Sequence, residues 1–128
     1  MSALILLVDD FPDGLEMYRE YLAFHGYRVV TAKNGEEAVA ATAVECPDLI
    51  LMDVQMPVMD GIDALRILRC QEAFALVPIV ALTAYALENE RRHMLLQGFD
   101  EVISKPCLPD DLVAAVERLL QANRTSAS

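Results

Sequence analysis

Residues 49–61 read LILMDVQMPVMDG, and this stretch decides the fold class. It opens with four apolar residues that do not alternate with polar ones, and the run stops at Asp53. Such a short, continuous apolar run is typical of a central parallel strand that is covered on both faces. Gly61 then precedes an apolar pattern at helical spacing. The stretch therefore predicts a buried strand, a connecting loop and a helix.

The same succession recurs along the whole chain. Further strand candidates lie at 4–8, 27–32, 77–82 and 101–104, the last being short and typical of an edge. Helical patterns follow them, beginning near residues 13, 34, 62, 87 and 109. Five strand–helix units in a row predict an α/β fold, in which right-handed crossovers place helices on both faces of one parallel sheet.

Local signals set the expected helix ends. Asp13 is a candidate N-cap for the first helix, which Gly26 would end, and Asn34 opens the second. Pro109 opens the fifth helix. Its apolar stripe consists of Leu112, Val113, Val116, Leu119 and Leu120. Residues 122–128 are small and polar, which predicts a frayed tail.

Composition limits the possible classes of function. The 128 residues fit a single domain, 1–128, with a core at about 3–121. The net charge of -10 disfavours direct binding to nucleic acid or anionic lipid. The chain has no apolar run of about 20 residues, and its first residues lack the positive region of a signal peptide.

Three cysteines, Cys46, Cys70 and Cys107, lie far apart without a CxxC pair. Their odd number argues against a disulfide framework and predicts reduced thiols in a cytoplasmic protein.

Polar residues stand where the predicted strands end. Asp9 and Asp10 follow the first strand, Asp53 ends the third, Thr83 follows the fourth, and Lys105 follows the fifth. The carboxyl ends of parallel strands share one edge of the sheet, where such folds bind their ligands. We therefore expect three carboxylates, a hydroxyl and an ammonium group in one cleft.

Clustered carboxylates repel one another, and a hard divalent cation relieves that repulsion. Mg²⁺ prefers one or two carboxylates, retained waters and a substrate phosphate, so the cluster predicts a phosphate-binding Mg²⁺ site, with Mn²⁺ as a possible substitute. Lys105 and Thr83 are suited to bind phosphate oxygens.

Four motifs together resemble the receiver domain of bacterial response regulators, of the chemotaxis-regulator type. They are the acidic pair 9–10, the stretch 51–61, ALTA at 81–84 and SKP at 104–106. The resemblance covers about residues 3–121. It implies a flavodoxin-like, three-layer fold with five parallel strands in the order 2-1-3-4-5.

The resemblance also implies roles for the clustered residues. Asp53 would accept a phosphoryl group from a phosphohistidine of a sensor histidine kinase or a histidine phosphotransfer protein. Asp10 and Asp53 would bind Mg²⁺, as would Asp9, directly or through water, and the backbone carbonyl of Val54. A downstream protein would then bind a changed surface of the fourth helix, fifth strand and fifth helix, so the chain would be a switch rather than an enzyme acting on other substrates.

The remaining family positions have supporting roles. By resemblance, Thr83 and Lys105 would hold phosphate oxygens, Pro57 and Gly61 would shape the loop after the acceptor, and a cis peptide before Pro106 would turn the lysine into the cleft. Asp60, by contrast, is expected to be a helix cap. His25 at a helix end and His93 on a charged face are not expected to be catalytic.

Three positions bear on variation within the family. Val102 stands where many receivers carry an aromatic residue that rotates as the switch operates, so this rotation is either absent here or replaced by another movement. Gln55 and Tyr85 flank the reacting phosphate in the family. The bulk of Tyr85 predicts slow access of water and a long-lived phosphorylated state.

Several alternatives stay open from the sequence. The chain is either a phosphorylated switch or an unphosphorylated interaction module on the same fold. An aspartyl-phosphate phosphatase is less favoured, because Gln55 stands where that enzyme class has a second aspartate. A nucleotide-binding function is disfavoured, since neither GxxxxGK[ST] nor GxGxxG occurs. The sequence leaves open a homodimer, and whether the chain acts alone or belongs to a longer protein.

Overall fold

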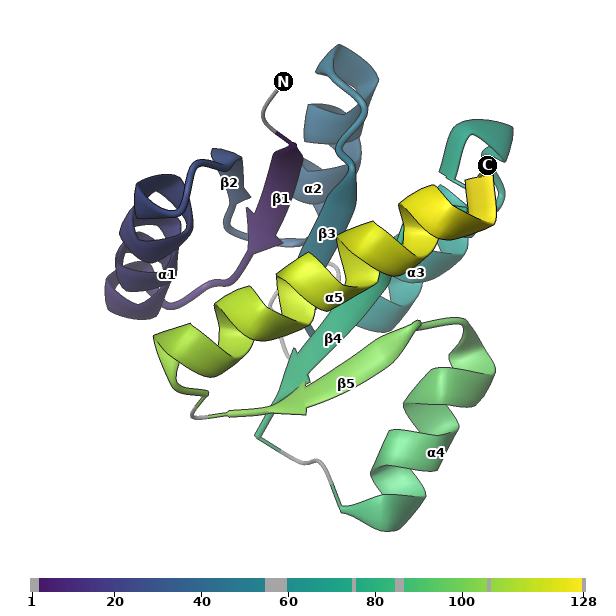
Figure 1. Ribbon diagram of the computed structural model, residues 1–128. Helices are drawn as coiled ribbons and strands as arrows, with labels where there is room; N and C mark the ends of the chain where they lie inside the picture. The colour runs from purple at the N-terminus through teal and green to yellow at the C-terminus, as the bar shows by residue number, and fades with distance from the viewer. Residues whose placement is uncertain (1–2, 55–59, 75, 85–86, 106, 128) are drawn as a thin grey trace.

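The computed structural model describes residues 3–54, 60–74, 76–84, 87–105 and 107–127 (Figure 1). Its strands are β1 (Leu4–Val8), β2 (Arg28–Ala32), β3 (Leu49–Asp53), β4 (Ile79–Thr83) and β5 (Glu101–Ser104). They form one parallel sheet in the order β2-β1-β3-β4-β5. The predicted fold class and strand order are therefore confirmed.

The α-helices are α1 (Pro12–Phe24), α2 (Gly35–Val44), α3 (Gly61–Arg69), α4 (Glu88–Gln97) and α5 (Pro109–Ala127), and a 3-10 turn, η1, spans Glu72–Phe74. Asn34 caps α2 as expected, because its side chain accepts a hydrogen bond of 2.8 Å from the amide of Glu37. Gly26 lies just past α1 with a φ of 93°, a conformation that favours glycine. Among the described residues, no helix combines the length and the apolar character needed to cross a membrane.

One expectation about the helix ends is wrong. Asp13 does not cap α1: the N-cap is Phe11, and Pro12 takes the first helical position, where its fixed φ suits the helix. Helix α5 continues to Ala127, and fraying of residues 122–128 stays a prediction. No glycine or proline interrupts 110–127, and each residue added to an existing helix gains a backbone hydrogen bond.

Side chains of the central strands alternate between two cores, one on each face of the sheet. Leu6, Ile50 and Met52 belong to the core under α2, α3 and α4, whereas Leu7 and Leu51 belong to the core under α1 and α5. Figure 1 shows α5 lying across the second face. Each fully buried side chain of this size contributes roughly 1.5–3 kcal/mol relative to exposure. The central strands β1, β3 and β4, which are buried at every residue, are therefore firmly anchored, whereas β5 is only partly buried.

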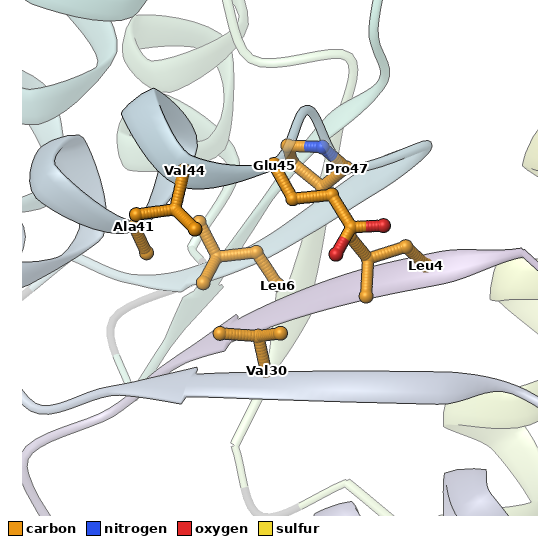
Figure 2. A pocket seen from close by; sticks show the side chains of 7 residues that line it. All are labelled: Leu4, Leu6, Val30, Ala41, Val44, Glu45 and Pro47. Carbon is orange, nitrogen blue, oxygen red and sulfur yellow. The ribbon is translucent and has the colours of Figure 1, made fainter.

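An apolar hollow of about 280 Å³ lies near the start of β1 and the carboxyl end of α2. Figure 2 shows its lining side chains: Leu4, Leu6, Val30, Ala41, Val44, Glu45 and Pro47. Glu45 is ion-paired with Arg28 at 2.9 Å. Asp9, Asp10 and Asp53, at the carboxyl ends of β1 and β3, are not among its lining residues.

Candidate functional site

The ends of β1 and β3 bring three carboxylates together. Val8 pairs with Met52 in the parallel register, so the residues that follow them, Asp9 and Asp53, lie side by side at the sheet edge. Carboxylate oxygens of Asp9, Asp10 and Asp53 all lie within 4.8 Å of one another. Asp9 and Asp53 are only 2% and 4% exposed, whereas Asp10 is exposed. The structure therefore assembles the acidic cluster that the strand ends predict.

Lys105 neutralises part of this charge. Its Nζ lies 3.0 Å from Asp9 Oδ2 and 3.1 Å from Asp53 Oδ2. Burial lowers the pKa of Lys105, but the hydrogen bonds and charges of Asp9 and Asp53 outweigh burial and leave its pKa raised. The ammonium group is thus held charged between the two buried carboxylates.

The two members of the acidic pair differ in their surroundings. Asp9 Oδ1 accepts a hydrogen bond of 2.9 Å from the amide of Phe11, while Asp9 Oδ2 is paired with Lys105. Asp10, one residue later, is exposed at the edge of the cluster. Both oxygens of Asp9 are therefore engaged, and Asp10 is the more accessible of the pair.

The backbone after Asp53 is shaped by Gly61. The amide of Gly61 donates a hydrogen bond of 3.0 Å to the carbonyl of Val54, which leaves that oxygen one lone pair for a further partner. A Cβ at position 61 would lie 2.6 Å from the carbonyl oxygen of Asp53. Only glycine allows α3 to start this close to β3. Asp60 caps α3, as expected, by accepting a bond of 2.9 Å from the amide of Asp63.

Thr83 lies at the same edge of the sheet. It is the last residue of β4, is fully buried and pairs in register with Ser104. The Lys105 amide donates a hydrogen bond of 2.8 Å to the Thr83 carbonyl, so the lysine segment is fixed to β4. Four further predicted positions, Gln55, Pro57, Tyr85 and Pro106, lie outside the described residues, as does the expected cis peptide before Pro106.

Val102 packs as a core residue of β5. Its side chain is 2% exposed in the same core as Met94 and Phe99. Its backbone carbonyl accepts a hydrogen bond of 3.0 Å from Arg91, which joins α4 to β5. A sequence pattern gives no direct sign of this contact, because the acceptor is a backbone atom. The two histidines are both exposed, one following α1 and the other on α4, in line with their predicted surface positions.

The donor set fits a hard divalent cation. The cluster offers carboxylate oxygens from Asp9, Asp10 and Asp53, with the Val54 carbonyl next to them in the chain. Oxygen ligands of this kind select Mg²⁺, Mn²⁺ or Ca²⁺ over metals that favour sulfur or imidazole. The small number of carboxylates suits Mg²⁺, which keeps several waters or phosphate oxygens in its shell.

Residues 5–117 match the response regulator receiver domain. The chain belongs to this family. It is thus a receiver domain of the two-component signalling class, as its motifs predict.

Similar proteins include both kinases and small regulators. The sensor protein GacS of Pseudomonas syringae pv. syringae is 43% identical over 115 residues, which are 88% of this chain but only 13% of GacS. The chain therefore spans a small part of that relative.

Solved receiver structures share the fold. The chemotaxis response regulator CheY4 of Vibrio cholerae has a TM-score of 0.89 at 31% identity, covering 93% of this chain and 99% of that one. The receiver domain of the sensor histidine kinase PA1611 from Pseudomonas aeruginosa PAO1, with a magnesium ion coordinated in its active site cleft, has a TM-score of 0.86 at 36% identity, with coverages of 94% and 99%.

Proposed function

We propose that this receiver is a phosphoacceptor, in which Asp53 takes a phosphoryl group from the phosphohistidine of a sensor histidine kinase or a histidine phosphotransfer protein. The single observation that carries this proposal is the cluster of Asp9, Asp10 and Asp53 with Lys105 bridging two of its members. We also propose a cytoplasmic location, where such partners present their phosphohistidines.

A Mg²⁺ ion, or Mn²⁺ in its place, would supply charge neutralisation for the incoming phosphoryl group. Asp10, Asp53 and the Val54 carbonyl are the ligands we assign to it. Asp9 would contribute directly or through water. The route through water would let its oxygens keep their present partners, the Phe11 amide and Lys105. The magnesium ion in the active site cleft of the PA1611 receiver supports the choice of this metal.

The residues of the chain have separate roles in the transfer. One carboxylate oxygen of Asp53 forms a bond to phosphorus as the bond from phosphorus to the imidazole nitrogen of the donor breaks. Lys105, already beside Asp53, pairs with an oxygen of the transferred group, and the Thr83 hydroxyl donates a hydrogen bond to another. The protein thus catalyses only its own phosphorylation and dephosphorylation.

Output would pass through the face of α4, β5 and α5 to a downstream protein. The phosphoryl group adds about -1.5 to -2 charge next to Thr83, which favours a shifted position of β4's end and the segment after it. No aromatic ring is available at Val102, and α4 is joined to β5 by the Arg91 hydrogen bond. We therefore propose that movement reaches α4 through this backbone contact.

Replacing the acceptor should abolish modification. Incubation of the chain with Mg²⁺ and a small acyl phosphate is expected to add the mass of one phosphoryl group, and Asp53→Asn should remove this mass increase because an amide is not a nucleophile for the donor. Intact-mass spectrometry measures both. Asp60→Asn is a matched control, because asparagine caps a helix as well as aspartate does.

The proposal would be contradicted if Asp53→Asn still gained the phosphoryl mass, or if the protein without substitutions did not gain it. A protein that takes no phosphoryl group but still binds partners would favour the interaction module. Turnover of an external phosphate ester would favour the phosphatase instead.

Magnesium should stabilise the fold through the acidic cluster. A ligand that binds only the folded state at ten times its Kd adds about 1.4 kcal/mol to the free energy of unfolding. Urea titrations with and without MgCl₂ measure this gain, and Mn²⁺ should act in the same direction. Asp10→Asn should lose most of it, because it removes the accessible carboxylate. An equal gain from NaCl at matched ionic strength would instead indicate general screening.

A further inference from the structure

The segment that carries Lys105 is fastened on two sides. On one side, the Lys105 amide donates a hydrogen bond of 2.8 Å to the carbonyl of Thr83 in β4. On the other, the carbonyl of Cys107 accepts a hydrogen bond of 2.7 Å from the hydroxyl of Tyr18 in α1. These two contacts join the lysine segment to two different elements, the sheet and the first helix.

Tyr18 lies in the core with its polar tip directed at this segment. Its side chain is 6% exposed and packs in the core between the sheet and α1 and α5. It also lines a hollow of about 320 Å³ together with Asp9 and Lys105. Burial raises the pKa of Tyr18 above its ordinary value, so the hydroxyl keeps its proton and remains a donor.

We propose that Tyr18 is a positioning residue for Lys105: its hydroxyl holds the Cys107 carbonyl and thereby fixes the ammonium group at the place where the phosphoryl group arrives. This inference rests on the proposed phosphoacceptor function. It adds a residue of α1 to a site otherwise built from strand ends.

The physical reason lies in the flexibility of lysine. A lysine side chain has about 2 kcal/mol of rotamer entropy to lose, so its ammonium is held well only if its backbone is also held. Lys105 must change partners from Asp9 and Asp53 to a phosphoryl oxygen while staying over the site. With the Lys105 amide held by the Thr83 carbonyl and the carbonyl two residues later held by Tyr18, this change requires only side-chain movement.

Tyr21 provides a matched comparison in the same helix. Its hydroxyl donates a hydrogen bond to the Asp110 side chain and so also links α1 to the chain that follows β5. That contact reaches the first turn of α5 rather than the lysine segment. Removal of either hydroxyl costs one hydrogen bond between α1 and the chain that follows β5, but only Tyr18 contacts a residue next to the Lys105 segment.

The test compares Tyr18→Phe with Tyr21→Phe in the full chain. The rate of phosphorylation by a small acyl phosphate is measured over a range of donor and Mg²⁺ concentrations. Tyr18→Phe should lower the rate at saturation by roughly three- to tenfold, the equivalent of one net hydrogen bond, with unchanged half-saturating concentrations. Amide hydrogen exchange at Lys105 should also be faster in this variant. Tyr21→Phe should change neither quantity.

An unchanged saturating rate or unchanged Lys105 exchange in Tyr18→Phe overturns the proposal, as does an equal loss of rate in Tyr21→Phe. Circular dichroism identifies a temperature at which all variants are folded, so that loss of folding is not counted as loss of rate. If the protein without substitutions takes no phosphoryl group, the proposed function fails. Comparing Lys105 amide exchange between the two variants still tests the contact of Tyr18 with the Cys107 carbonyl.

Discussion

Arg69→Ala is expected to lower the free energy of unfolding by about 2 to 4 kcal/mol, although Arg69 takes no part in the acidic cluster. Its guanidinium group joins the end of α3 to three other parts of the chain. Nη1 donates to the carbonyls of Phe74 and Val77 at 2.8 and 2.9 Å, and Nη2 donates to the Gly98 carbonyl at 3.0 Å and to Asp100 Oδ2 at 2.6 Å.

The backbone acceptors account for most of this expected loss. The side chain of Asp100 is 44% exposed, so its ion pair with Arg69 contributes at most about 1 kcal/mol. Asp100 also keeps a partner in the variant, because the same oxygen accepts a bond of 2.8 Å from the amide of Ile79. The carbonyls of Phe74, Val77 and Gly98 lose a charged donor, and each such bond is worth more than a neutral one.

Chemical denaturation followed by circular dichroism measures the change. Arg66→Ala is the matched control, since Arg66 is exposed on the same helix and makes a hydrogen bond of 3.0 Å to Gln97. That substitution should cost less than about 1 kcal/mol. A loss for Arg69→Ala no larger than the loss for Arg66→Ala would show that the bonds to the carbonyls contribute little.

The strand ends could be predicted from the sequence for a simple physical reason. An apolar run in a doubly covered sheet must stop where the chain reaches solvent or a site, so Asp53 and Thr83 mark the ends of β3 and β4. Parallel pairing then brings those ends to one edge without any further information. The gathering of Asp9, Asp10, Asp53 and Lys105 followed from this argument and is present in the structure.

Contacts to backbone carbonyls could not be predicted in this way. Nothing in the sequence sets Tyr18 and Arg69 apart from ordinary helix residues, because the acceptor of Tyr18 and three of the four acceptors of Arg69 are main-chain oxygens, which carry no sequence signature. A buried tyrosine does need a partner for its hydroxyl, which was the one available signal for Tyr18. The prediction that Asp13 caps α1 failed for a different reason. Asp13 favours a helix that starts after it, whereas Pro12 favours the first helical position itself, and the helix starts at Pro12.

Gly61→Ala should damage the fold and the site together. The added Cβ would lie 2.6 Å from the Asp53 carbonyl oxygen and 2.9 Å from the Cα of Val54. Both are backbone atoms of a buried strand end, so α3 or β3 must shift as a whole. We expect a loss of about 2 to 3 kcal/mol in the free energy of unfolding. The rate at which Asp53 is phosphorylated should fall by roughly tenfold or more, because displacements of this size disturb a reacting geometry.

Gly14→Ala separates this clash from the general effect of replacing glycine in a helix. Its Cβ would meet only Phe11 Cδ1, at 3.3 Å, and Phe11 is a side chain that is 60% exposed and free to turn aside. Removing a glycine from α1 should instead raise stability by about 0.4–1 kcal/mol through the unfolded state. The two substitutions are chemically identical, so opposite signs in urea denaturation would assign the loss at position 61 to the contact with Asp53. If Gly61→Ala is as stable as Gly14→Ala, then β3 and α3 can separate without a loss of stability. In that case the close contact between Gly61 and the Asp53 backbone does not hold Asp53 in place.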